Sequence, residues 1–396
     1  MTVPADGYFI GDMRQTPDGE WSPVSSKPVL SLVGLKVLAE KSSHGIYESL
    51  REAGRDIQHN VLIIGLDSDR GAKDAVETIA RRFKTSADEL LKTPFFLYLE
   101  EYITLVGTEN SVPRDIASLL KHPNFLGVIS HIKDTCVKVF TSLGIRCYHL
   151  PTSSTEKDAT RISNRIASLS SDRPITLVHW GSYKDFTDDN AHNRGMGIVN
   201  QLVGGLLQKK VNVRLLMKNA TLQRNMSKSG YGAPALNPRA FAPFKDENSL
   251  EQHAERVELV TEYLAGEELQ ELFYTGDIFL LPSRQVHSAS LTNAFSYGMP
   301  VIGSTGWGMS EYCFNSFNSL TGDVAEGHFP YHEIERIDGM YVERMLPRLT
   351  ALCGDRGLLA KMSENTLAWY NSNHSRENHK ANLHGLVDLA MSRHVR

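Results

Sequence analysis

Short apolar runs alternate along this chain with amphipathic stretches, and the alternation occurs in two separate blocks. Runs such as 60–65 (NVLIIG) and 95–99 (FFLYL) have the length and continuous hydrophobicity of strands buried on both faces. The predicted strands are 29–33 (where a helix over 36–40 competes), 60–65, 95–99, 126–129 and 146–150, then 175–179, 213–217, 257–260, 277–281 and 300–302. The predicted helices are 46–53, 137–143, 197–208, 267–274, one opening at 293–297, 341–352, 358–371 and 374–393. This pattern favours an α/β chain with two Rossmann-like doubly wound halves.

The boundary between the two halves is predicted at a polar stretch. Residues 151–172 are rich in Ser, Thr and charged side chains, which is typical of a linker. We predict one domain over 1–172, with an N-terminal extension over 1–28, a second over 173–373, and a final helix over 374–396. Ligands of such sheets bind at the carboxyl ends of the strands, so the default site lies between the two halves.

Composition excludes several classes of protein. The chain has 396 residues, 41% hydrophobic residues and a formal net charge of −4, so neither wholesale disorder nor duplex binding by bulk charge is expected. Its four cysteines form no CxxC pair and are expected to be reduced. No apolar run reaches the roughly 20 residues of a membrane span, and 1–28 lacks the apolar core of a signal peptide. We therefore expect a cytoplasmic protein.

The stretch 276–322 carries the most specific pattern in the sequence. It contains Leu-Pro-Ser at 281–283, Gly-Met-Pro-Val-Ile at 298–302, a Gly-rich turn at 306–308 and Asn-Ser-Leu at 318–320. In this order the pieces resemble the donor-binding signature of glycosyltransferase family 4. The resemblance implies the GT-B fold and a retaining, metal-independent transfer of sugar from a UDP- or GDP-sugar to an acceptor hydroxyl on a glycan, lipid-linked or small-molecule acceptor, with no cofactor and no metal site.

Upstream segments add to this resemblance. The segment 177–184 (LVHWGSYK) followed by Arg194, the segment 257–281 and the segment 127–144 are similar to family strands and turns. The family pattern implies that the first domain binds the acceptor, the second binds the donor and the last helix crosses back to the first domain. The donor-binding residues that it implies are Ser182, Lys184, Arg194, Lys218, Gln285, Val286, His287, Ser288, Ala289 and Asn293.

The chemistry of a diphosphate explains these residue types. The amides of His287, Ser288 and Ala289 precede the predicted helix and would bind the anion. A cation such as Arg194 or Lys184 would offset the charge of the leaving group when no metal does.

Two positions depart from the family. Its two acidic positions fall on Gln285 and Asn293, whose amides form hydrogen bonds but lack charge. Either the chain is an active enzyme of a divergent branch, or it is a non-catalytic GT-B module that has lost the site.

The first domain offers weaker candidates for catalytic residues. Gly45 precedes a predicted helix, Glu101 follows the predicted strand 95–99, and His131 follows the predicted strand 126–129. Each has an ordinary alternative as a helix cap, a polar loop residue or a buried histidine. The Asp-Ser-Asp at 67–69 is interpreted as a helix cap rather than a metal motif, and His374, His379 and His384 are expected on the surface.

One basic loop leaves a further alternative open. The segment 224–245 (RNMSKSGYGAPALNPRAFAPFK) has interleaved aromatic residues and no acidic residue. It is interpreted as a surface loop, as an acceptor-binding lid, or as a nucleic-acid contact. The last option is suggested by a similar run in phage DNA α-glucosyltransferases and implies a hydroxylated base as acceptor. A homodimer is a further possible assembly.

Overall fold

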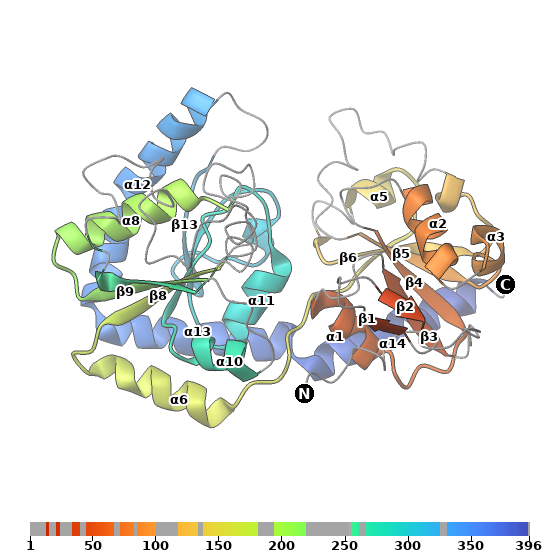
Figure 1. Ribbon diagram of the computed structural model, residues 1–396, viewed down its shortest axis with the longest axis horizontal. Coiled ribbons are helices and arrows are strands. Elements are labelled where there is room, and N and C mark those ends of the chain that lie inside the picture. The colour runs from red at the N-terminus through yellow and green to blue at the C-terminus, as the bar shows by residue number, and fades with distance from the viewer. Residues whose placement is uncertain are drawn as a thin grey trace. The chain divides into compact units, whose positions relative to one another are not determined.

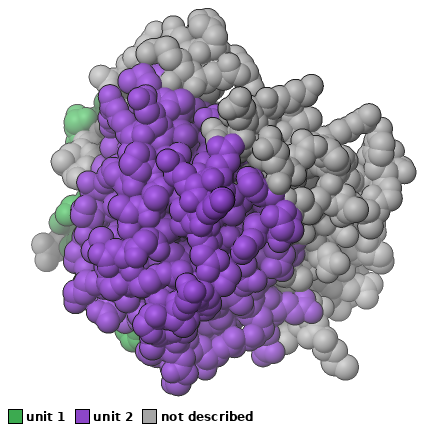
Figure 2. Space-filling model, turned by 90° about the vertical axis from the view of Figure 1, so that its left-hand side faces the viewer, with its two compact units in different colours: residues 1–155, 373–396 green, residues 156–372 purple. Residues whose placement is uncertain are grey.

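The structure is a computed structural model in which the chain forms two compact units. Unit 1 comprises Met1–Thr155 and Asn373–Arg396, and unit 2 comprises Glu156–Ser372 (Figures 1 and 2). The structure describes residues 13–15, 21–23, 34–39, 45–66, 72–82, 85–99, 118–133, 138–180, 194–218, 253, 255–260, 267–324 and 331–394. Each unit contains a parallel sheet with interleaved helices, which confirms the predicted fold class.

The sheet of unit 1 has its strands side by side in chain order. Its five strands are all parallel and lie in the order β3-β4-β5-β6-β7. Every residue of β4, β5 and β6 is buried, as expected for continuous apolar strands in a parallel sheet. The strands are β3 (Leu35–Ala39), β4 (Val61–Leu66), β5 (Phe95–Leu99), β6 (Phe125–Ser130) and β7 (Cys147–His149), and a hairpin pairs β1 (Met13–Gln15) with β2 (Trp21–Pro23). The helices are α1 (Gly45–Ala53), α2 (Ala72–Arg82), α3 (Ala87–Leu90), α5 (Lys138–Ser142) and α14 (Arg376–His394).

Unit 1 is completed by α14, which packs against α1 and β6. Two histidines fix the start of this segment to the chain that follows β7. Nδ1 of His374 lies 2.7 Å from the carbonyl oxygen of Thr152, and Nδ1 of His379 lies 2.7 Å from that of Pro151. The prediction that these two histidines lie on the surface is wrong, because they are only 5% and 4% exposed. Their buried position lowers the pKa of each to about 4.

The sheet of unit 2 reverses its strand order. Its six parallel strands are arranged β10-β9-β8-β11-β12-β13, so the chain winds outward from β8 in one direction and then from β11 in the other. This is the Rossmann order, in which the reversal lies between the first and fourth strands. The strands are β8 (Ile175–Trp180), β9 (Val213–Lys218), β10 (Val257–Val260), β11 (Ile278–Leu280), β12 (Val301–Ser304) and β13 (Ser319–Gly322).

Helices flank this second sheet (Figure 1). One of them, α6, lies inside the stretch 151–172 that was predicted to be a linker, so that part of the prediction is wrong. It forms because the Asp158 carboxylate caps it, accepting from the backbone N–H groups of Thr160 and Arg161, and because Ile162 and Ile166 are buried. The helices are α6 (Ala159–Ala167), α8 (Met196–Gln208), α10 (Glu267–Tyr274), α11 (Ser288–Ser296), α12 (Tyr331–Gly354) and α13 (Arg356–Asn373), with short 3₁₀ turns η4 (Ser168–Ser170) and η7 (Met309–Glu311).

Other predicted boundaries also differ from the structure. The predicted strand 29–33 lies outside the described residues, and residues 36–39 of the competing helix lie in β3. Helix α12 begins at Tyr331, ten residues before the predicted start at 341. Helix α11 begins at Ser288, five residues before the predicted start at 293, so Ser288 and Ala289 belong to its first turn rather than to the loop before it.

Candidate functional site

The candidate site lies at the carboxyl edge of the unit 2 sheet, which we define as the edge where β8, β9, β11 and β12 end. At the reversal of strand order, β8 and β11 are joined by His179, whose Nδ1 donates to the Leu280 carbonyl oxygen at 2.8 Å. His179 is fully buried, and burial lowers its pKa to about 4. Its imidazole is therefore neutral at pH 7 and holds two strand ends together.

The start of α8 lies against the loop that follows β11. Gly195 precedes this helix with φ of +71°, and a Cβ there would lie 2.3 Å from the carbonyl oxygen of Pro282. Only glycine fits such a close approach at positive φ. Arg194, half-buried, comes directly before it and helps to lower the pKa of His179 by charge repulsion. The cation predicted to bind a phosphate is therefore located beside the strand-order reversal.

The loop after β11 is held by backbone hydrogen bonds, a close approach at a glycine and a buried ion pair. Val286 N–H donates to the Trp307 carbonyl oxygen at 2.8 Å, and Trp307 N–H donates to the Arg284 carbonyl oxygen at 3.0 Å. A Cβ on Gly306 would lie 2.5 Å from that same Arg284 oxygen. The Arg284 guanidinium forms a buried ion pair with Asp338 of α12, at 2.9 Å and 3.1 Å. The loop conformation is thus fixed by its neighbours.

This loop leads into α11, whose first turn carries most of the predicted anion-binding amides. His287 precedes the helix and is 5% exposed, whereas Ser288 is completely buried. Gln285, Ala289 and Asn293 are half-buried. The N–H groups at the start of a helix carry partial positive charge, so this end of α11 is suited to an anion.

Lys218 extends the same edge beyond β8. It ends β9, pairs with Trp180 across the strands, and places Nζ 5.7 Å from the centroid of the Trp180 indole. Phe273 also stacks on the Trp180 ring, at 4.9 Å between ring centroids. Burial lowers the pKa of Lys218. Arg194, Lys218 and residues 285–289 and 293 of the predicted donor set are therefore all positioned by unit 2.

The unit 1 candidates occupy the equivalent strand ends of their own sheet. His131 directly follows β6 and is fully buried, with its Nδ1 3.5 Å from the Tyr98 hydroxyl. Gly45 is the first residue of α1. Several predicted residues lie outside the described part of the chain: Glu101, Ser182, Lys184, the Asp-Ser-Asp at 67–69 and the loop 224–245.

Sequence reasoning assigned no role to four residues of this edge. His179 ended the predicted strand 175–179 and Trp180 appeared only within the segment 177–184, although their position at the end of β8 was a usable signal. The Arg284–Asp338 pair joins residues 54 apart, and no local pattern indicated it. Among the described residues, no group of three or more His, Cys, Asp or Glu side chains could hold a metal ion. Nor does any described helix have the length and apolar character to cross a membrane.

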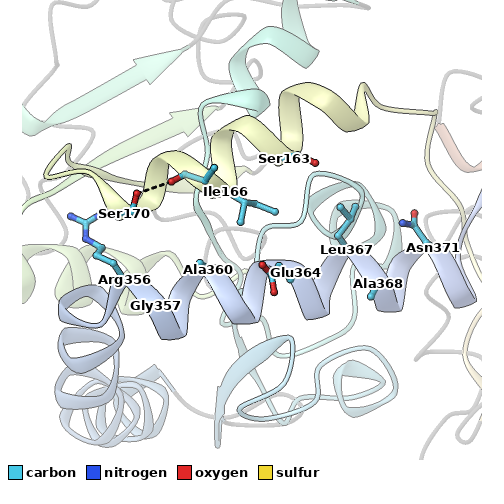
Figure 3. Close-up of a pocket in the computed structure, with 11 residues that line it drawn as sticks. Ser163, Ile166, Ser170, Arg356, Gly357, Ala360, Glu364, Leu367, Ala368 and Asn371 are labelled. Carbon is cyan, nitrogen blue, oxygen red and sulfur yellow. Dashed lines mark hydrogen bonds between the residues drawn. The ribbon is translucent and has the colours of Figure 1, made fainter.

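Another cavity of unit 2 lies away from this edge. It has a volume of about 680 Å³ and lies between α6 and α13 (Figure 3). Ile166 and Leu367 contribute its apolar wall, and Arg356 and Glu364 lie at its polar positions. It is formed by helix sides rather than strand ends and is not part of the carboxyl edge.

Comparison with known proteins gives structural but not sequence matches. No protein-family model and no curated protein matches the sequence. Anabaena HepE, solved with UDP and glucose, aligns with a TM-score of 0.52 at 12% identity over 84% of this chain and 77% of that one. An α,α-trehalose 6-phosphate synthase from Burkholderia multivorans aligns at 0.52 and 11%, over 88% and 74%.

A third match is WaaG, a glycosyltransferase involved in lipopolysaccharide biosynthesis. It aligns with a TM-score of 0.51 at 10% identity, over 85% of this chain and 95% of that one. At such identities the likeness concerns the fold. Together with the two parallel sheets, it shows that this chain has a GT-B fold made of two Rossmann-like α/β units.

Proposed function

We propose that this chain is a glycosyltransferase that transfers a sugar from a nucleotide-sugar donor to an acceptor hydroxyl. The observation that carries the proposal is the reversal of strand order between β8 and β11, with Arg194 and the start of α11 beside it. Ligands of open α/β sheets bind at such a reversal. The fold likeness to HepE, which was solved with UDP and with UDP-glucose, supports a nucleotide sugar as the ligand.

The donor diphosphate binds at the first turn of α11 in this proposal. The amides of 287–289 and the Arg194 guanidinium offset its charge as it leaves, so no metal is needed. The resemblance to family 4 supports a retaining reaction. The acceptor oxygen forms the new bond to the anomeric carbon on the face from which the diphosphate departs, and a departing phosphate oxygen takes the acceptor proton. Unit 1 contributes the acceptor site, for which His131 is the described candidate.

Nucleotide binding tests this proposal directly. Titration calorimetry with UDP, GDP, ADP and CMP, with and without EDTA, should show one selective binder whose affinity survives EDTA. Arg194→Gln should weaken that affinity at least tenfold, because one charge-assisted contact to phosphate is worth about 1.5–3 kcal/mol. Arg344→Gln, on an exposed arginine of α12, is the matched control and should bind normally. Failure of the wild-type chain to bind any nucleotide would overturn the proposal.

A non-catalytic module is the second candidate, favoured by the amides at positions 285 and 293. Both side chains are half-buried at the site, so they are placed to contact a ligand but carry no charge. The double variant Gln285→Glu, Asn293→Glu separates the candidates in an assay of donor hydrolysis or transfer. Activity in the wild type that falls in the variant identifies the amides as working residues. Activity that appears only in the variant identifies a degraded site.

A further inference from the structure

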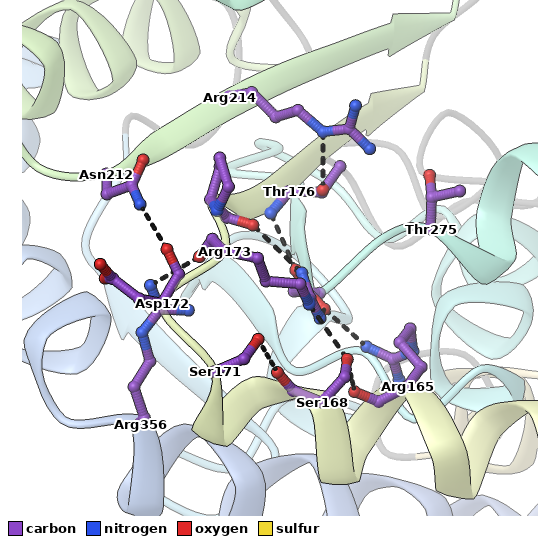
Figure 4. Close-up of polar contacts among 12 residues, drawn as sticks. Arg165, Ser168, Ser171, Asp172, Arg173, Thr176, Asn212, Arg214, Thr275 and Arg356 are labelled. Atoms are coloured by element: carbon purple, nitrogen blue, oxygen red, sulfur yellow. Dashed lines mark hydrogen bonds and ion pairs between the residues drawn. The ribbon is translucent and has the colours of Figure 1, made fainter.

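A second polar cavity lies at the opposite edge of the unit 2 sheet, which we call the amino edge because β8, β9 and β11 begin there. Its volume is about 520 Å³. Three arginines from different elements line it: Arg165 from α6, Arg173 from the segment before β8, and Arg214 from β9. Figure 4 shows these three side chains and their polar contacts. The remaining lining residues are Asn164, Ser168, Pro174, Thr176 and Thr275. None of these described lining residues is acidic.

Two of the arginines are neutralised by one buried carboxylate. Arg173 forms a bidentate pair with Asp277, with both nitrogen–oxygen distances 2.7 Å. Arg165 approaches the same carboxylate at 3.3 Å, and Asp277 also accepts from the Thr176 N–H at 2.8 Å. Asp277 is completely buried, so its oxygens are used by these partners. Three arginines and one carboxylate leave two positive charges in excess.

The third arginine is held in place without an acidic partner. Arg214 Nε donates to the Thr176 hydroxyl at 2.9 Å, which fixes the direction of its guanidinium (Figure 4). Within the described part of the chain, its two terminal nitrogens donate to no protein group. The Nε of Arg165, in a side chain that is 7% exposed, likewise has no partner among the described residues. Burial lowers the pKa of Arg165, because the charged guanidinium is less favourable away from water than in it.

We propose that this cavity binds a phosphate dianion, either free or as a monoester. A guanidinium fork matches the spacing of phosphate oxygens, and a dianion balances the two excess charges. Thr275 and Asn164 add neutral hydrogen-bonding groups to the wall. The volume exceeds that of phosphate alone and accommodates the organic part of a small ester. The site is independent of the proposed donor site, which lies at the other end of the same strands.

A purely structural role explains only part of this arrangement. Arg165 and Arg173 clamp α6 to the sheet, since Arg165 also donates to the Tyr297 carbonyl oxygen at 2.5 Å. Arg214 contributes nothing to that clamp beyond its bond to Thr176. A fixed cation beside two others, without a counterion, is the feature that indicates a ligand.

Thermal unfolding with inorganic phosphate tests the proposal, with NaCl added to hold the ionic strength constant. Phosphate at fifty times its dissociation constant should raise the midpoint of the wild-type chain by roughly 5 °C. Arg214→Gln should abolish the rise, and Arg214→Lys should retain only part of it. Lys361→Gln removes an exposed cation of α13 and should keep the full rise. Glycerol 2-phosphate in a parallel titration distinguishes an ester site from a site for free phosphate.

Three results would overturn the proposal. The first is an equal rise with NaCl alone, and the second is an unchanged response in Arg214→Gln. The third is a response lost in Arg194→Gln but kept in Arg214→Gln, which would place the phosphate at the donor site. Arg214→Gln is expected to fold, because among the described contacts the substitution removes only the hydrogen bond to Thr176. Its thermal midpoint without phosphate should stay within about 2 °C of the wild type.

Discussion

The two edges of the unit 2 sheet are built from the same strands in different ways. At the amino edge, charged side chains join elements through Asp277 and its two arginines. At the carboxyl edge, the strands are joined by backbone hydrogen bonds, close approach at Gly195 and a neutral imidazole at His179, and the one buried ion pair described there, Arg284–Asp338, is balanced one to one. Among the described residues, no carboxylate forms an ion pair with the Arg194 guanidinium at the carboxyl edge. The comparison teaches that the carboxyl edge can be rigid while a cation such as Arg194 stays without a carboxylate partner from the described residues.

The largest effect is expected from removing the carboxylate of the amino edge. Asp277→Asn leaves the buried Arg165 without its counterion and should lower the free energy of unfolding by about 3–5 kcal/mol. Urea denaturation followed by tryptophan fluorescence measures this, because three of the four tryptophans belong to unit 2. Glu271→Gln is the control: it breaks the exposed ion pair with Arg161 and should not move the midpoint. A small effect of Asp277→Asn would contradict the view that charge holds this edge.

The carboxyl edge should instead respond to acid through His179. Its folded pKa is about 4 and its ordinary value is 6.5, so the unfolded chain takes up the proton first. Stability is therefore full above pH 6.5 and is lost as the pH falls towards 4, by roughly 3 kcal/mol in total. The difference between wild type and His179→Gln in urea midpoint should shrink from pH 7 to pH 4.5. A constant difference between wild type and His179→Gln over this pH range would disprove the assignment.

A smaller effect is expected where glycine allows the close approach at the carboxyl edge. Gly195→Ala places a Cβ against the Pro282 oxygen at positive φ, which should cost about 1–3 kcal/mol and weaken nucleotide binding tenfold or more. Calorimetry and urea denaturation measure both. Gly385→Ala in α14 meets no atom within 4 Å and should stabilise the chain by about 0.5–1 kcal/mol. Normal binding by Gly195→Ala would show that the approach of α8 is not required.

The smallest effect concerns the cation above Trp180. Lys218→Met keeps the aliphatic packing and removes the cation–π contact, so the loss of stability should stay below about 1 kcal/mol. The blue shift of tryptophan emission and the urea midpoint report it, with Lys361→Met as the exposed control. A loss of several kcal/mol would show that the carboxyl edge depends on charge as strongly as the amino edge does.

Local sequence predicted elements well where burial is continuous. The apolar runs at β4, β5 and β10 allowed little other structure, and their predicted ranges agree with the structure to within one residue. Helix α6 escaped prediction because its buried face has few residues in a polar background. The start of α11 was placed too late because no side chain of residue 287 caps the helix.

Long-range partners account for the remaining differences. His374 was assigned to the surface because the spacing of the three histidines does not put them all on one helix face, whereas the acceptor that holds it lies 222 residues away. Asp277 forms ion pairs with Arg165 and Arg173, which lie 112 and 104 residues away in the sequence. Residues 285–289 follow one another along a single strand–loop–helix segment, so local sequence was enough to place them together. Their role in binding a donor stays a prediction.

The hydrogen bond between His374 and the Thr152 carbonyl, which joins two distant parts of unit 1, has a consequence for synthesis on the ribosome. Unit 1 is interrupted after Thr155 and resumes at Asn373, with unit 2 inserted between the two parts. The first part of unit 1 is made early but cannot bury the apolar surface beneath α14 until the whole insertion has been translated. Unit 2 is continuous in sequence, so all the residues of its fold have been translated before α14 is made. A chain truncated after residue 372 and released from the ribosome should therefore carry a protease-resistant second half and a protease-sensitive first half.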